Sequence, residues 1–202
     1  MMMLLAGGVI FGCAAVCGIA LATLWCSRSA PLEDGPPPGA ARPVALVAGA
    51  VLLGIVLVWR GAPLRELGLS ALLCIPLAGV WYSDAVKGIV PDAFTLVPLA
   101  IVAVYVVTHQ AWWLALSAVV PFVPFALAAL LSKGRGMGWG DVKLVALGGA
   151  VLGAQISLLA FALACLAAVV VSYARGRRGG AIAFAPYLTS AIALAIPIGI
   201  AR

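Results

Sequence analysis

The chain has 202 residues, of which 65% are hydrophobic and only 9% are charged, and its mean hydropathy is +1.23. A soluble domain carries about a quarter charged residues, so most of this chain faces lipid, which excludes a soluble enzyme, a nucleic-acid-binding domain, a disulfide scaffold and a disordered chain. The net charge of +6 requires no nucleic-acid partner, because membrane proteins concentrate Lys and Arg in cytoplasmic loops.

Eight apolar segments follow one another, each bounded by charged or turn-forming residues. They are residues 3–25, 44–59, 67–86, 93–109, 111–131, 141–154, 156–174 and 181–201. A helix needs about 20 residues to cross the hydrocarbon core, and the segments lack the polar–apolar alternation of barrel strands. The sequence therefore predicts an all-α, polytopic transmembrane bundle of about eight helices, in which the sixth is short and either spans or half-inserts.

The first segment and the loop after it predict no extra domain. Residues 1–26 lack the basic start of a signal peptide, and their apolar stretch is longer than the apolar region of a signal peptide. We therefore expect a membrane span that is retained in the mature protein. Residues 27–43 are rich in Pro and Gly, which predicts a short irregular loop. We expect a single membrane domain over 1–202, with two N-terminal spans in 1–66 and a six-helix core in 67–202.

The five cysteines include no Cys-x-x-Cys pair, and no histidine lies near them in the sequence. They are Cys13, Cys17, Cys26, Cys74 and Cys165. Because isolated cysteines in apolar runs usually serve as small apolar side chains, we expect neither a metal site nor a cofactor.

The basic residues predict which loops face the cytoplasm. With eight spans, one side carries Arg28, Arg42, Lys87, Lys133, Arg135, Lys143, Arg175, Arg177 and Arg178. The other side carries Arg60, Arg65 and Arg202. The positive-inside rule places the richer side in the cytoplasm and both termini outside. Omitting the sixth span would divide the basic residues evenly, so eight spans are favoured.

Four of the six acidic residues have ordinary explanations. Glu33, Asp34 and Glu66 lie in or beside predicted loops and are expected to be solvated. Asp92 follows Pro91 at the start of the fourth span, where free backbone N–H groups and the helix dipole favour an acid. We therefore expect Asp92 to cap that helix.

The other two acids, Asp84 and Asp141, are less easily explained. Asp84 lies near the end of the third span, where the dipole disfavours an anion, although Lys87 three residues later offers an ion pair. Asp141 opens the sixth span and alone is consistent with an N-cap. It follows glycines that allow a backbone or an extended peptide to approach closely, namely Gly134, Gly136, Gly138 and Gly140.

Together, Asp84 and Asp141 suggest acid–base chemistry. Both lie at predicted cytoplasmic ends of spans, and two close carboxylates share a proton because they cannot both ionise easily. One can then deprotonate a water while the other donates to a carbonyl oxygen, as peptide hydrolysis requires. The single histidine, His109, is predicted at the opposite face as an interfacial residue.

Three motifs resemble those of the type IV prepilin peptidases, bacterial membrane aspartic proteases with a Gly-x-Gly-Asp motif. GMGWGDVKL, residues 136–144, is similar to the most distinctive stretch of that family. Asp84, eight positions before the Asp92 of VPD, is similar to its first catalytic aspartate and the downstream Pro-Asp. FAPYL, residues 184–188, is similar to a C-terminal Phe-Gly-Pro motif, with Ala185 in place of glycine.

The resemblance implies catalytic roles for Asp84 and Asp141 and supporting roles for Lys143 and Asp92. The motif glycines Gly138 and Gly140, and Lys87 beside Asp84, are further candidates for substrate-binding or supporting roles. It also implies a prepilin or pseudopilin substrate whose short basic leader is cut after a Gly at the cytoplasmic membrane face. Many family members also methylate the new N-terminus and carry paired Cys-x-x-Cys motifs between the first two spans. Residues 27–43 contain no cysteine, which argues against a cytoplasmic domain of that kind and against methylation.

Two other readings remain open from the sequence. A presenilin-like or signal-peptide-peptidase-like protease also uses Gly-x-Gly-Asp, but no Pro-Ala-Leu tripeptide follows Asp141 here. A transporter or assembly scaffold would place acids deep within its spans, whereas Asp84 and Asp141 are predicted at their ends.

Overall fold

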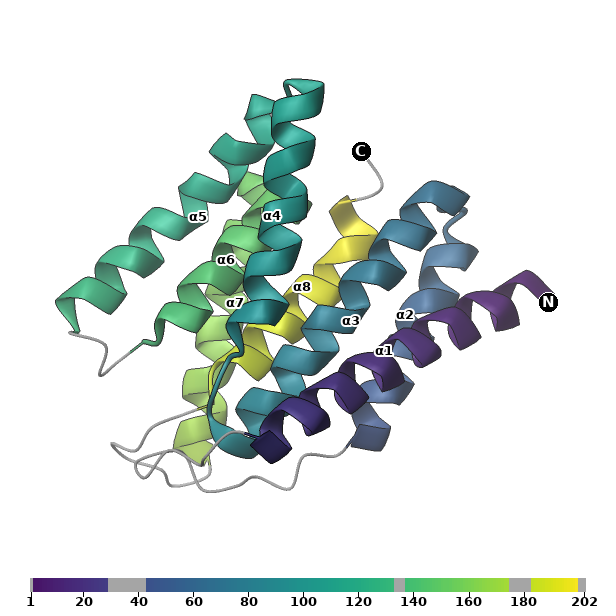
Figure 1. Ribbon diagram of the computed structural model, residues 1–202, viewed down its shortest axis with the longest axis horizontal. Helices are drawn as coiled ribbons and strands as arrows, with labels where there is room; N and C mark the ends of the chain where they lie inside the picture. The colour runs from purple at the N-terminus through teal and green to yellow at the C-terminus, as the bar shows by residue number, and fades with distance from the viewer. Residues whose placement is uncertain (1, 29–42, 133–136, 175–182, 200–202) are drawn as a thin grey trace.

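The computed structural model describes residues 2–28, 43–132, 137–174 and 183–199. Helices make up 91% of these residues, and no strand occurs among them. The helices are α1 (Met2–Arg28), α2 (Pro43–Trp59), α3 (Leu64–Lys87), α4 (Asp92–His109), α5 (Trp112–Leu131), α6 (Trp139–Leu152), α7 (Ala154–Ala174) and α8 (Ala185–Gly199) (Figure 1). The predicted all-α, polytopic bundle is therefore confirmed.

Several residues used in the sequence analysis lie outside the described residues. They are most of the linker, residues 29–42, the glycines Gly134 and Gly136, and the basic residues Arg42, Lys133, Arg135, Arg175, Arg177, Arg178 and Arg202.

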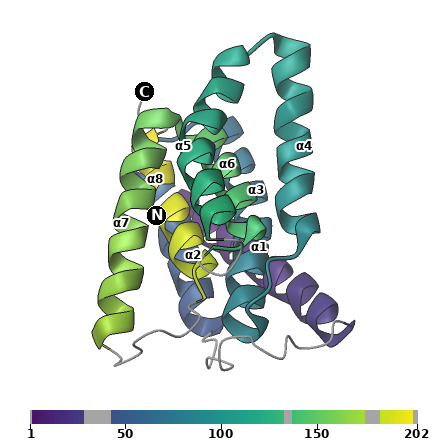
Figure 2. The ribbon, with the colours of Figure 1, turned by 90° about the vertical axis from the view of Figure 1, so that its left-hand side faces the viewer.

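Helix length and burial divide the bundle into outer and inner helices. Among the described helices, α1, α3, α4, α5 and α7 are long and apolar enough to cross a membrane. The short helix α6 buries nine of its 14 residues, whereas α4 buries only Thr95 and Val106. Figure 2 shows α6, α8 and α3 between α7 on one side and α4 on the other. Because α6 is enclosed by other helices, its length need not match the thickness of the lipid.

Small residues allow close packing of the N-terminal helices. A side chain at Gly18 of α1 would overlap the carbonyl of Ile75 in α3, and one at Gly54 of α2 would overlap the backbone of Gly7 in α1. Such close approach is typical of membrane helices, whose association depends on van der Waals packing. The first two helices are thus fixed against α3, which carries Asp84.

Five helix termini meet at one end of the bundle, here called the aspartate end and defined by Asp84, Asp92 and Asp141. The Lys87 ammonium at the end of α3 donates to the carbonyl of Cys26 near the end of α1. The starts of α4 and α6 are joined through Asp92 and Lys143, and the start of α8 contacts Asp84. These contacts bring together segments far apart in the sequence.

The opposite end of α4 carries the histidine. His109 is the last residue of α4, and its ring stacks on Tyr105 with ring centroids 4.2 Å apart. His109 therefore lies at the far end of α4 from Asp92 and takes no part in the aspartate end.

Candidate active site

Asp84 lies in the last turn of α3 and is 6% exposed. Its Oδ2 accepts a hydrogen bond from the backbone N–H of Ala185, at 3.1 Å. Ala185 is the first residue of α8, and the start of a helix presents free N–H groups and the positive end of its dipole. The dipole of α3 disfavours a negative charge on Asp84. The free N–H groups at the start of α8 offset this effect.

Asp141 lies in the first turn of α6 and is 9% exposed. The helix begins at Trp139 with Gly138 as its N-cap residue, so the expectation that Asp141 itself is the N-cap was wrong by three positions. The Asp141 carboxylate lies close to the backbone of the N-cap residue Gly138. Asp141 is the third residue of the helix, the position from which a side chain reaches back toward the N-cap N–H in a capping box.

The fold brings Asp84 and Asp141 together although 57 positions separate them. Helices α3 and α6 both pack against α4 and α8, and the two carboxylates are close enough for their charges to interact. Both side chains are buried, so little water screens that interaction. A buried pair of interacting carboxyl groups favours one ionised and one protonated member, which is the division required for acid–base hydrolysis.

The turn between α3 and α4 packs directly on the start of α6. Gly88 ends α3 in the left-handed conformation, with φ 66°, and Val90 follows two residues later. A Cβ at Gly140 would lie 2.6 Å from the Val90 Cβ, whereas a Cβ at Gly138 would meet nothing nearer than Asp141 Oδ2 at 3.7 Å. Of the two motif glycines described, Gly140 is therefore the one that packing requires.

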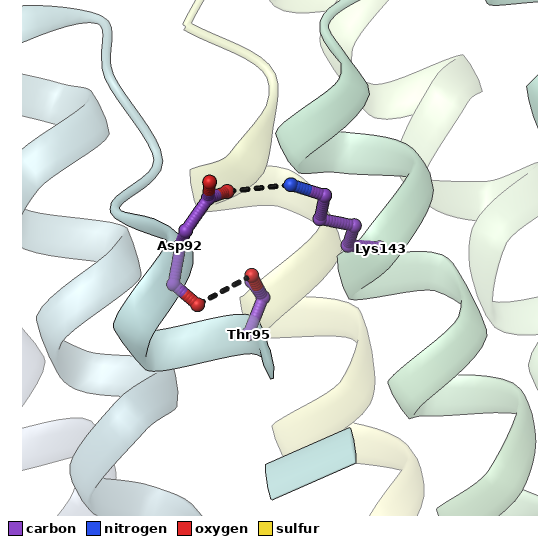
Figure 3. A network of polar contacts seen from close by, with 3 residues as sticks. All are labelled: Asp92, Thr95 and Lys143. Atoms are coloured by element: carbon purple, nitrogen blue, oxygen red, sulfur yellow. Dashed lines mark hydrogen bonds and ion pairs between the residues drawn. The ribbon is translucent and has the colours of Figure 1, made fainter. Parts of the chain in front are cut away.

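An ion pair links the starts of α4 and α6. Lys143 Nζ lies 2.6 Å from Asp92 Oδ1, with the side chains 29% and 65% exposed respectively. The Thr95 hydroxyl donates to the Asp92 carbonyl at 3.2 Å (Figure 3). Asp92 lies in the first turn of α4, as expected, and the N-cap residue itself is Pro91. The Asp92 side chain ties α4 to the helix that carries Asp141.

Among the described residues, Lys87 does not form the ion pair with Asp84 that its spacing of three residues suggested. Its ammonium donates to the Cys26 carbonyl of α1, while the hydrogen bond described for Asp84 comes from Ala185. Lys87 therefore holds α3 to α1 beside the site.

Residues 71–173 match the type IV leader peptidase family. The chain belongs to this family. The match includes Asp84, Asp92 and the Gly138–Asp141 segment, and no curated protein and no solved structure gives a match. The predicted resemblance is thus confirmed, and the protein is a peptidase with several helices able to span a membrane.

The hydrogen-bond donor to Asp84 in this peptidase could not be recognised from the sequence. Ala185 lies beyond the matched residues 71–173 and 101 positions from Asp84. Its contribution is a backbone N–H, which every residue except proline carries, so residue type alone gives no signal. The one relevant signal in the sequence is the FAPYL motif, because a proline such as Pro186 is common at the start of a helix and marks where α8 begins.

The Asp92–Lys143 pair gives a first testable prediction. Because Asp92 is largely exposed, we expect Asp92→Asn to cost at most about 1 kcal/mol of unfolding free energy. Peptidase activity should fall only a few-fold, by roughly two to five, since the ion pair positions α6 without touching the aspartates. Cleavage rates and melting temperatures of the Asp92→Asn and Lys143→Gln variants measure both effects. A loss as complete as that of Asp84→Asn would show that Asp92 takes part in the chemistry.

Proposed function

We propose that the protein is a membrane aspartic endopeptidase that removes the short basic leader of type IV prepilins or pseudopilins, and so serves pilus assembly or protein secretion. The observation that carries this proposal is the pair of buried carboxylates, Asp84 and Asp141, at one end of a membrane helix bundle. Asp141 belongs to a Gly-x-Gly-Asp motif, and membership of the type IV leader peptidase family supports a substrate whose leader is removed by a cut after a Gly.

In the proposed reaction, the ionised aspartate takes a proton from water and the water oxygen bonds to the scissile carbonyl carbon. The protonated aspartate gives its proton to the carbonyl oxygen. When the carbon–nitrogen bond breaks, the first aspartate gives the proton it took from water to the leaving amine. The second aspartate takes a hydroxyl proton from the tetrahedral intermediate, which restores the carbonyl group and the starting protonation of the pair. The products are a leader with a new carboxylate and a pilin with a new amino terminus.

We further propose that the 202 residues form one peptidase domain in the bacterial plasma membrane, with a catalytic core over 67–202 and the aspartate end at the cytoplasmic face. The support is the distribution of basic residues, together with Lys87 and Lys143 at the aspartate end. The same distribution supports external termini.

A reporter fusion tests the orientation. A cytoplasmically active reporter joined after residue 178 should be active, because in the eight-span topology seven spans precede that point and bring the chain to the cytoplasm. The matched fusion after Arg60 should report the outside. An external signal after residue 178 would contradict the eight-span topology.

Incubation of the purified peptidase with a full-length prepilin tests the proposed function. Mass spectrometry should show a single cut after the Gly that precedes the apolar helix. The same spectrum reports N-methylation, which we do not propose because the first loop lacks cysteines. An intact prepilin, or a cut elsewhere, would contradict the proposed function.

A further inference from the structure

An apolar groove of about 560 Å³ opens between α2, α3 and α8. Its lining lies between residues 45 and 56 of α2, 74 and 81 of α3, and 189 and 197 of α8, with Ala15 added by α1. The lining is apolar apart from Thr189 and Ser190, and the hydroxyls of both bond to carbonyls of their own helix. The groove therefore offers almost no polar partner to an occupant.

One end of the groove reaches the aspartate end. Trp81 lines the groove and precedes Asp84 by three residues, which is about one helical turn. Thr189 also lines it and follows Ala185 by four residues, and the Ala185 N–H donates to Asp84. The walls formed by α3 and α8 thus each end about one helical turn from the Asp84 carboxylate or its hydrogen-bond donor.

The dimensions and lining of the groove fit one kind of occupant. Residues 45 to 56 of α2 rise about 17 Å, roughly half of the 30 Å hydrocarbon core. An extended peptide would leave its backbone groups unpaired against apolar walls, whereas a helix pairs its own. Small lining residues also allow a helix backbone to approach closely, and they include Ala45, Gly49, Ala50, Ala78 and Ala193.

We propose that this groove binds the apolar transmembrane helix of the substrate, the segment that directly follows the leader. A helix lying along the groove ends beside Trp81 and Thr189, so the residues before it continue toward Asp84. Binding of the membrane anchor then places the peptide bond at the edge of the helix against the aspartates. This proposal rests on the proposed function and adds where the anchor of the substrate lies.

Two glycines give a matched test. Gly49 lines the groove, Gly68 of α3 does not, and both are exposed helical positions where an added Cβ meets no atom within 4 Å. Gly49→Leu therefore adds an apolar side chain to the groove from a position with open space around its Cβ, while Gly68→Leu adds the same side chain elsewhere. We expect Gly49→Leu to raise KM for full-length prepilin about tenfold, equivalent to about 1.4 kcal/mol, and Gly68→Leu to leave it unchanged.

A short peptide substrate distinguishes an effect of Gly49→Leu on binding in the groove from an effect on the catalytic site. With a soluble peptide that carries the leader and cleavage site but no apolar helix, Gly49→Leu should match the parent. An unchanged KM of Gly49→Leu for full-length prepilin would overturn the proposal and leave the groove to lipid or a second copy. Equal losses on both substrates would also overturn it, because they indicate damage to the site or fold.

Photo-crosslinking tests occupancy independently of turnover. A photoreactive side chain at Gly49 should crosslink to the apolar helix of prepilin, and one at Gly68 should not. Equal crosslinking at both positions, or none at Gly49, would overturn the proposal. Failure of the parent to cut full-length prepilin would instead contradict the proposed function itself.

Discussion

Asp84→Asn and Asp141→Asn are each expected to lower the rate of prepilin cleavage by about a thousandfold, within the usual range for an acid–base group. This corresponds to about 4 kcal/mol of transition-state stabilisation. An amide can neither take the proton from water nor donate one as a carboxylic acid does. Single-turnover cleavage by the purified variants measures the loss.

Both variants should remain folded. The Asn side-chain oxygen can still accept from Ala185 N–H at position 84 and from the Gly138 backbone at position 141. Since both positions are buried, replacing a carboxyl by an amide removes no solvated charge. Asp92→Asn is the matched control, because it makes the same change at a largely exposed aspartate. Near-parent cleavage by either catalytic variant would refute the paired-aspartate mechanism.

Gly140→Ala should produce the second large effect. Its Cβ would lie 2.6 Å from the Val90 Cβ, so either the turn after α3 or the start of α6 must move. Overpacking of this kind costs about 1–3 kcal/mol, and a shift of about 1 Å in a reacting group can slow catalysis a hundredfold. We expect cleavage to fall about a hundredfold, as measured by kcat on full-length prepilin.

Gly138→Ala is the comparison for Gly140→Ala. Its Cβ would have Asp141 Oδ2 at 3.7 Å as nearest neighbour, and its φ of −78° suits alanine. Its N–H also remains, so we expect a rate within about threefold of the parent. Val90→Gly removes the atom that Gly140→Ala overlaps and should restore part of the lost activity. Equal losses at both glycines, with no rescue, would show that the contact with Val90 is not the cause.

The helices could be predicted from the sequence because lipid demands long apolar segments bounded by polar residues. Each helix begins and ends within four residues of its predicted segment. Prolines inside the segments, such as Pro76 and Pro98, did not mislead the prediction, since both lie within continuous helices. Membrane helices tolerate proline because neighbouring groups satisfy the freed backbone.

The contacts of the site could be predicted only in part. The positions of Asp84 and Asp141 at helix ends followed from the sequence, and the scarcity of acids singled them out. The partners of Lys87, Asp92 and Asp84 did not follow, because each is set by packing between helices rather than by local spacing. The spacing offered Lys87 as an ion-pair partner of Asp84 within the same turn, yet its ammonium donates to the Cys26 carbonyl of α1. Local patterns carry no information on such choices.

The central claim is that Asp84 and Asp141 act as one unit, and a double-mutant cycle tests it most directly. Single-turnover cleavage of prepilin is measured for the parent, Asp84→Asn, Asp141→Asn and the variant with both changes. Residues that act as a unit give strongly non-additive losses, so the double variant should be about as slow as either single variant. Losses that multiply, or a single variant that cuts at nearly the parent rate, would contradict the account.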